Sequence, residues 1–143
     1  MHRAGAIPFR FTGSKFTSVE VLLITSMTRK RWILPKGMVE ADEPHTKTAI
    51  REALEEAGVK GKLITDFPMT VLIERQFEDG FEHVPVTFFP MLAKSTSKKW
   101  QEMGARERRW AGLREARQLV AEDDYAELLL QFETLLPAIV ERA

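Results

Sequence analysis

The 143-residue sequence predicts an α/β fold in which a mixed β-sheet is packed between helices. The main observation is the order of its segments, because stretches typical of strands and of helices alternate as strands, helix, strands, helix. The second is size, since the chain is long enough, and at 44% apolar enough, to bury a sizeable core. We therefore expect residues 1–143 to form a single domain.

Two strands are predicted near the N-terminus, at residues 4–11 and 19–27, because both segments are rich in aliphatic and aromatic residues. The turn-like residues 12–15 separate them. A short apolar segment follows and stops at the proline and glycine of the sequence PKG. Residues 38–43 are polar, so we expect a loop there that leads into the first helix.

The first helix is predicted over residues 44–58. Pro44 is a residue favoured in the first helical turn, and Gly58 is a frequent helix terminator. The small side chains within this segment suggest close packing against the sheet. Apolar residues recur there at helical spacing and predict a buried stripe formed by Ala49, Ile50, Ala53, Leu54 and Ala57.

Three more strands are predicted after this helix, at residues 59–67, 69–77 and 83–94. The DG dipeptide at positions 79 and 80 predicts a hairpin between the last two. A further short strand is predicted at residues 107–113. The remainder of the chain has apolar residues at helical spacing and is expected to be helical.

The composition excludes several classes of function. Lys and Arg number 21, as do Asp and Glu, so no net charge attracts nucleic acid, and an anionic ligand must be held by a local cluster. The absence of cysteine excludes disulfides, thiolate zinc sites and cysteine nucleophiles. No apolar run is long enough for a signal peptide or a membrane span, so we expect a cytoplasmic protein without membrane contact.

The first predicted helix carries three carboxylates on one face, those of Glu52, Glu55 and Glu56, opposite the alanine-rich stripe. Like charges at this spacing repel, and Arg51 can pair with Glu55 but cannot neutralise all three. The face is either a solvated surface, which the helix in isolation favours, or a site for a divalent cation such as Mg²⁺, which prefers oxygen ligands.

The residues before this helix favour the metal site. Residues 37–59, GMVEADEPHTKTAIREALEEAGV, resemble the Nudix box in all of its fixed positions, which are filled by Gly37, Glu43, Arg51, Glu52, Glu55, Glu56 and Gly58. This resemblance implies an α/β/α sandwich. It also implies hydrolysis of a nucleoside diphosphate linked to another moiety, or of a related pyrophosphate, with Mg²⁺ or Mn²⁺.

The resemblance also implies roles for individual residues. Glu52 and Glu56 would be metal ligands, with Glu55 a third ligand or a base that acts through water. The backbone carbonyl of Lys36 would complete the ligands from the protein. Arg51 and Glu43 would brace the loop against the helix. Three glutamates outside the box remain alternative bases: Glu82, Glu102 and Glu107.

Further segments are similar to the diphosphoinositol polyphosphate phosphohydrolase branch, which also cleaves diadenosine polyphosphates. They are RWILPKGMVE, EEAGVKGKL and the later pattern of Trp100, Arg106, Arg108 and Trp110. The similarity implies that Arg3, Arg106 and Arg108 contact substrate phosphates. The branch has a glycine triplet where this chain reads PKG, so Lys36 is either a phosphate contact or a loop residue in water.

The leading hypothesis is a pyrophosphohydrolase acting on a polyphosphorylated small molecule, with dinucleoside polyphosphates first and diphosphoinositol polyphosphates next. Nucleoside triphosphates and nucleotide sugars remain alternative substrates. A different class is a Nudix-fold module that binds a nucleotide-like ligand without turnover, although the intact glutamates argue against it. A third hypothesis, hydrolysis at RNA 5′ ends, is weakened by the zero net charge, because RNA is a long polyanion. We expect a monomer or a homodimer.

Overall fold

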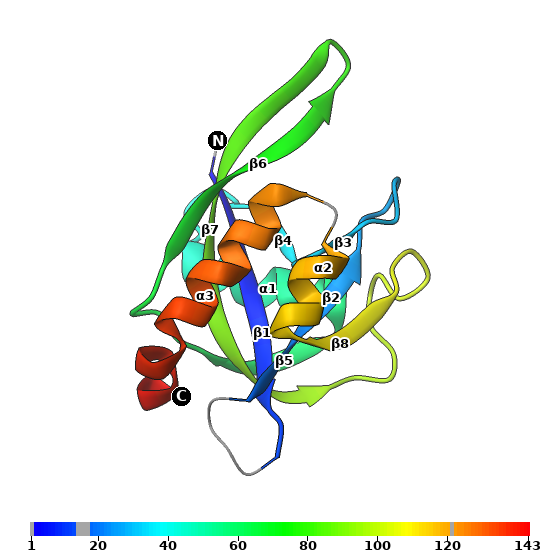
Figure 1. Cartoon of the computed structure of the whole chain (residues 1–143). Coiled ribbons are helices and arrows are strands. Elements are labelled where there is room, and N and C mark those ends of the chain that lie inside the picture. Colours follow the sequence, from blue (N-terminus) through cyan, green and yellow to red (C-terminus); the bar gives the residue numbers. More distant parts are fainter. Residues whose placement is uncertain (1, 14–17, 121) are drawn as a thin grey trace.

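The computed structural model describes residues 2–13, 18–120 and 122–143 (Figure 1). The predicted turn at residues 12–15 lies partly outside these residues. No helix in the described ranges is long and apolar enough to cross a membrane. The elements are, in order, β1 (Arg3–Phe11), β2 (Val19–Thr25), β3 (Trp32–Ile33), β4 (Lys36–Met38), α1 (His45–Ala57), β5 (Val59–Leu63), β6 (Met69–Phe77), β7 (Gly80–Thr96), β8 (Arg108–Gly112), α2 (Leu113–Leu119) and α3 (Asp123–Arg142).

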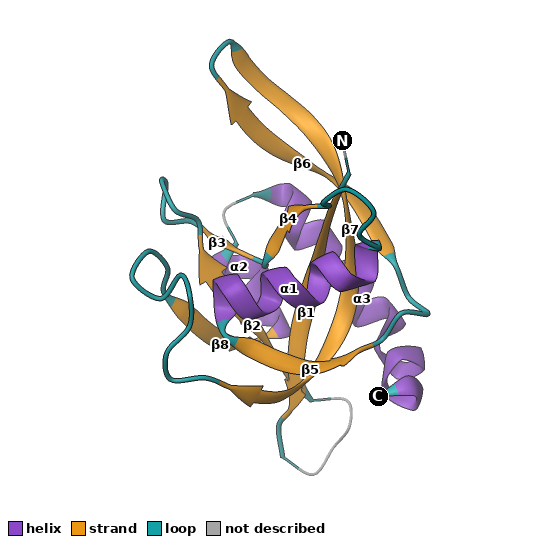
Figure 2. Cartoon of the chain, turned by 180° about the vertical axis from the view of Figure 1, so that it is seen from behind, coloured by secondary structure: helices purple, strands orange, loops and turns teal. Residues whose placement is uncertain are grey.

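The strands form one mixed sheet with the central order β3-β2-β1-β7-β5. β4 also pairs with β1, β6 with β7, and β8 with β2. β1 and β7 are parallel, and their register places Arg3 opposite Val86. The other pairs between named strands are antiparallel. Helix α1 covers one face, while α2 and α3 cover the other (Figures 1 and 2), so the predicted α/β/α sandwich is confirmed.

The sheet separates two apolar cores because successive residues of a strand point to opposite faces. In β1, Ile7 and Phe9 belong to the core shared with α3, where the rings of Phe9 and Phe132 lie 5.5 Å apart. Ala6 belongs to the smaller core beneath α1 and meets a helix face that is also built from alanines. Small side chains on both sides bring α1 close to the strand that carries Arg3.

The helix predicted from Pro44 to Gly58 is confirmed as α1, but its buried face is rotated from the predicted stripe. Ile50 and Leu54 are exposed by 46% and 37%, so their predicted burial was wrong. Glu52 and Glu56 are instead buried beside the alanines rather than opposite them. The helix packs against β4 as well as β1, and this second contact covers the glutamate side.

Strands β6 and β7 form a long hairpin that projects from the body of the molecule (Figure 1). The hairpin was predicted, but its turn is formed by Glu78 and Asp79 rather than by the DG dipeptide. Gly80 has a φ of 137°, which favours glycine, and begins β7 opposite Phe77. β7 is longer than predicted and pairs with β1, β5 and β6, which places the hairpin beside the first strand.

Candidate active site

The glycine of β4 lies against the first of the buried carboxylates. A Cβ atom at Gly37 would be 2.2 Å from the carboxyl carbon of Glu52. β4 is held in this place because it pairs with β1, with Gly37 opposite Ala4. A residue without a side chain is therefore required for the carboxylate to approach the backbone.

Arg51 and Glu43 are brought together as the motif implied. Arg51 donates from Nε and Nη2 to the two carboxylate oxygens of Glu43, at 3.0 and 2.9 Å. The hydroxyl of Thr48 donates to Glu43 at 2.6 Å. These hydrogen bonds lower the pKa of Glu43 to about 2. Because Arg51 also donates to the carbonyl of Met38, it links the loop after β4 to the helix.

Glu52 and Glu56 form a buried carboxylate pair one helical turn apart. Glu56 accepts a hydrogen bond from the backbone N–H of Lys36 at 3.0 Å and one from Arg106 at 3.1 Å. Glu52 accepts one from Arg51 at 2.7 Å. Burial is the main cause that raises the pKa of Glu56 to about 8 and that of Glu52 above its usual value; the charge of Glu52 adds to the shift of Glu56.

Glu55 is less buried than this pair but lies near it, because Nη1 of Arg51 is 2.7 Å from the carboxylate of Glu52 and 3.6 Å from that of Glu55. In the part of the chain that the structure describes, no three acidic or histidine side chains converge into a ready metal cluster. The pair itself fits a hard divalent cation, since two desolvated carboxylates beside a bare glycine backbone offer oxygen ligands whose charges repel each other. Glu52 and Glu56 would hold such an ion.

A cavity of about 470 Å³ opens beside Glu56, between the β2–β3 loop, β4, the β6–β7 hairpin and the start of α3. Its wall is rich in cations. Arg3 is buried, and burial together with the charge of Arg75 lowers its pKa. Burial also lowers the pKa of Lys36, which has Arg3, Arg75 and Arg106 as positive neighbours. Such a cluster suits a ligand with several negative charges.

The predicted phosphate contacts are only partly brought together. Arg3, Lys36 and Arg106 line the cavity together with Glu56. Arg106 is already engaged, since it also donates to Glu102 at 2.8 Å and to the carbonyl of Thr25 at 3.0 Å.

Arg108 is not among the residues that line this cavity, which differs from its predicted contact with substrate phosphates. It donates instead to the carbonyl of Ala57 at 2.9 Å and stacks on Trp100. β8 begins only at Arg108, so Arg106 precedes the strand; Arg106 donates to the carboxylate of Glu56, whereas Arg108 donates to a backbone carbonyl of the same helical turn.

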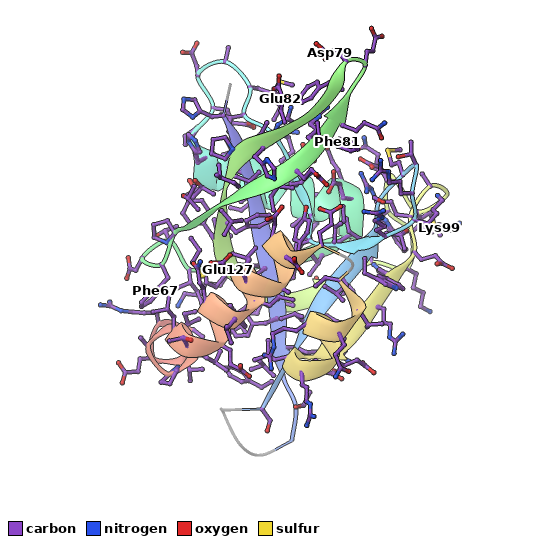
Figure 3. The ribbon with its side chains drawn as sticks, turned by 45° about the horizontal axis from the view of Figure 1, so that its top comes forward. Phe67, Asp79, Phe81, Glu82, Lys99 and Glu127 are labelled. Carbon is purple, nitrogen blue, oxygen red and sulfur yellow. The ribbon has the colours of Figure 1, made fainter. Side chains whose placement is uncertain are left out.

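The alternative bases outside the box do not line the cavity either. Glu102 is held by Arg106, and the backbone N–H of Glu107 donates to the hydroxyl of Thr25. Glu82 lies on the projecting part of the hairpin near Asp79 (Figure 3). Within the described residues, the acidic side chains that line the cavity are those of Glu56 on α1, Glu74 on β6 and Glu122 just before α3.

The hairpin and α3 contribute cavity residues that the sequence reasoning missed. Arg29 donates to the side chain of Gln76 at 2.6 Å and lies over the ring of Phe81 at 5.6 Å, which joins the β2–β3 loop to the hairpin. Tyr125 belongs to the C-terminal segment that was predicted only to be helical; it is buried but borders the cavity, and burial raises its pKa well above the ordinary value.

Arg75 is a further missed residue, and a signal for it existed. It follows Val71 and Ile73 at a spacing of two on β6, so it occupies the inward face of that strand. A charged residue that continues a buried strand face is a candidate for a site.

A model of the NUDIX domain matches residues 1–132. The chain belongs to the NUDIX family. It is 33% identical to Nudix hydrolase 21, chloroplastic, of Arabidopsis thaliana, over 90% of this chain and 64% of that protein. It is 32% identical to Nudix hydrolase 4 of the same plant, over 80% of this chain and 56% of that protein. The NUDIX chain thus spans less than two thirds of the length of these curated relatives.

A shorter match falls within one branch of the NUDIX family. Over 45 residues, 31% of this chain and 27% of the other, the sequence is 53% identical to diphosphoinositol polyphosphate phosphohydrolase 3-alpha of Mus musculus. Among solved structures, an Ap4A hydrolase binary complex from C. elegans has a TM-score of 0.74 at 23% identity, covering 96% of this chain and 98% of that one. At this identity the structural likeness shows the fold alone, which confirms the Nudix-type sandwich.

Proposed function

We propose that this NUDIX protein is a divalent-metal-dependent pyrophosphohydrolase acting on a polyphosphorylated small molecule. The observation that carries the proposal is the buried Glu52–Glu56 pair at the edge of a cavity lined by Arg3, Lys36 and Arg75. Neither arginine has a carboxylate partner in the described ranges of the chain. Two arginines without carboxylate partners, together with Lys36 and two buried acids, suit a substrate that carries both phosphates and a metal ion.

The residues divide the proposed reaction between them. Mg²⁺ or Mn²⁺, held by Glu52 and Glu56 with Glu55 and the Lys36 carbonyl as further ligands, would neutralise phosphate oxygens and lower the pKa of bound water. Arg3, Lys36 and Arg75 would bind the phosphates that remain negatively charged. Water attacks one phosphorus, the anhydride P–O bond breaks, and the second phosphoryl group leaves. Glu55, if it is not a ligand, accepts the proton of that water.

Dinucleoside polyphosphates are the first substrate class that we propose, and diphosphoinositol polyphosphates are the second. The structural neighbour named as an Ap4A hydrolase is in keeping with the first class, and the short match to a diphosphoinositol polyphosphate phosphohydrolase supports the second. A rival function is the binding of a nucleotide-like ligand without turnover. One structural neighbour, the NUDIX domain of Shewanella oneidensis NrtR, was solved with ADP ribose and has a TM-score of 0.67 at 17% identity, over 95% of this chain and 88% of that one. The intact set of Glu52, Glu55 and Glu56 argues against this rival, and Arg51 holds Glu55 close to Glu52 because its Nη1 contacts both carboxylates, at 3.6 and 2.7 Å.

Some expectations stay predictions. We propose one NUDIX domain over residues 1–143, active as a monomer or homodimer. A cytoplasmic location is the expectation from the sequence, although several relatives are named mitochondrial, as is Nudix hydrolase 16 of Arabidopsis thaliana.

The test is phosphate release with Mg²⁺ from a panel of pyrophosphates, measured for the wild type, Glu56→Gln and the control Glu141→Gln. The panel contains diadenosine penta- and hexaphosphate, a diphosphoinositol phosphate, nucleoside triphosphates and ADP-ribose. Glu56→Gln should lower turnover by more than about a hundredfold with its fold intact by circular dichroism. Glu141, an exposed residue of α3, should be replaceable without effect. Near-normal turnover of Glu56→Gln at saturating Mg²⁺, or a wild type inactive on the whole panel, would refute the proposal.

A further inference from the structure

The C-terminal end of α1 is capped by groups from a distant segment of the chain. A helix end leaves its last four carbonyls without partners inside the helix. Here each of the carbonyls of residues 54–57 accepts a hydrogen bond. The donors are the N–H of Gly58 to Leu54 at 3.0 Å, the N–H of Glu102 to Glu55 at 3.1 Å, the indole N–H of Trp100 to Glu56 at 3.0 Å, and Nη1 of Arg108 to Ala57 at 2.9 Å.

The two side-chain donors support each other. The guanidinium of Arg108 lies 3.9 Å from the centre of the Trp100 ring and also donates to the carbonyl of Ser97. Gly58 makes this approach possible, because a Cβ atom there would lie 2.8 Å from both side chains. Its backbone φ of 64° ends the helix at the same point. We call Trp100, Arg108 and the backbone of Glu102 the clamp.

The segment that carries the clamp also holds the carboxylate of Glu56. Arg106 lies between Glu102 and Arg108 in the sequence and donates to Glu56 at 3.1 Å. Its side chain is only 8% exposed, and its other donors are held by Glu102 and by the carbonyl of Thr25. Both the backbone carbonyl and the carboxylate of Glu56 are therefore positioned by residues 100–108.

We infer that Trp100 and Arg108 are positioning residues for Glu56, which affect the proposed hydrolysis without touching the substrate. The inference rests on the proposed function for its kinetic consequence. Neither side chain lines the cavity, and each contacts the last turn of α1 directly. A displacement of about 1 Å in a catalytic group can slow a reaction by about a hundredfold, so loss of one cap should reduce kcat.

The experiment compares Trp100→Phe, Arg108→Gln and Arg108→Lys with the control Lys99→Gln. Phenylalanine keeps the ring beneath Arg108 but removes the N–H that binds the Glu56 carbonyl. Lysine keeps a charge and one donor, whereas glutamine removes the charge. Lys99 lies in the same segment, is exposed (Figure 3), and has no hydrogen bond or ion pair from its side chain within the described chain.

Kinetics are measured well below the unfolding temperature, on a nucleoside triphosphate and on diadenosine hexaphosphate. We expect kcat to fall about tenfold in Trp100→Phe and Arg108→Gln, equally for both substrates, with KM changed less than about twofold. Arg108→Lys should recover part of the rate, and Lys99→Gln should match the wild type. Amide hydrogen exchange in residues 54–58 should be faster in the two impaired variants, independently of any activity.

Three results would overturn the inference. A KM that rises more for the hexaphosphate than for the triphosphate would make Arg108 a substrate contact. A lower unfolding temperature with unchanged kcat in Trp100→Phe and Arg108→Gln would show that both residues only stabilise the end of the helix. Unchanged hydrogen exchange in residues 54–58 would show that the clamp does not order this turn. An inactive wild type would refute the proposed function instead. Hydrogen exchange would then be the remaining test of whether the clamp orders residues 54–58.

Discussion

Glycine is required at position 37 because the Glu52 carboxylate lies where a side chain would be, and not because of its own backbone angles. It is extended in β4, and the space that its side chain would occupy holds the Glu52 carboxylate. The two positions are coupled in the folded protein although fourteen residues separate them in the motif. A contact between a backbone and a flexible carboxylate can relax, so a side chain at this position should disturb chemistry more than folding.

This coupling predicts that Gly37→Ala impairs activity at little cost in stability. The added methyl group would displace the Glu52 carboxylate from β4, and with it one of the proposed metal ligands. We expect kcat to fall by at least about tenfold while the unfolding temperature changes by only a few degrees.

Gly104→Ala is the matched control, because a Cβ atom at Gly104 would meet nothing within 4 Å. Activity measurements and thermal unfolding of both variants decide the point. Equal activity of Gly37→Ala and Gly104→Ala would show that Glu52 tolerates the displacement.

At the scale of elements, α1 is fixed at both ends by different means. Its N-terminal half is joined to the loop after β4 through Glu43 and Arg51. Its C-terminal end is held by the clamp. The glutamates between these attachments are thus presented by a helix that can neither slide nor rotate without breaking charged hydrogen bonds.

The attachment through Glu43 predicts a pH-dependent contribution to stability. The pKa of Glu43 is depressed from 4.5 to about 2, so its contribution is fully present above about pH 4.5. It is lost as the pH falls towards 2, where the folded protein also takes up the proton. The difference in unfolding temperature between the wild type and Glu43→Gln should therefore be constant above about pH 5 and shrink between about pH 4.5 and 2.

The unfolding temperatures of the wild type and Glu43→Gln are measured across this pH range. Glu141→Gln is the control for the loss of an exposed carboxylate. A difference between wild type and Glu43→Gln that stays constant down to pH 2 would mean that the ion pair with Arg51 does not stabilise the protein.

On the scale of the whole molecule, the positive charge of the cavity comes from the folding of distant segments onto one wall and not from an excess of basic residues. The chain has no net charge, yet Arg3, Lys36, Arg75 and Arg106 come from four separate segments to one wall. Basic residues scattered along the sequence are concentrated where β4 and the hairpin flank β1. The attraction for an anion is therefore local and depends on the folded arrangement.

Arg75→Gln should consequently raise KM for diadenosine hexaphosphate by about tenfold and affect a nucleoside triphosphate less, since a long phosphate chain reaches more of the wall. Arg114→Gln is the control, because Arg114 is exposed on α2 and has no ion pair in the described chain. Steady-state kinetics on both substrates test the difference. An equal KM change for both substrates would remove Arg75 as a determinant of phosphate number.

Features encoded by neighbouring residues were predictable from the sequence. The box lies within one continuous segment, so its resemblance to a known motif was enough to predict the pairing of Glu43 with Arg51, whereas the burial of Glu52 next to Gly37 was not predicted. Helical periodicity located α1, but it could not tell which edge of the stripe faces β4, and Ile50 was placed on the wrong side.

Features that depend on distant strands were not predictable in this way. The spacing on β6 marks Arg75 as a candidate, but its place beside Arg3 and Lys36 depends on the pairing of β6 with β7 and of β7 with β1. The position of Arg108 at the end of α1 depends on the register of β8 against β2. The contacts of both side chains are therefore set by the tertiary arrangement.

The parallel pairing of β1 with β7 has a consequence for synthesis. Arg3 at the start of the chain pairs with Val86, so β1 leaves the ribosome long before its central partner is translated. At about 5–20 residues per second the delay is roughly 4–17 s. During this interval an apolar strand with an open edge is exposed to chaperones and to other nascent chains. The cavity wall that includes Arg3 can form only when the second half of the protein has been made.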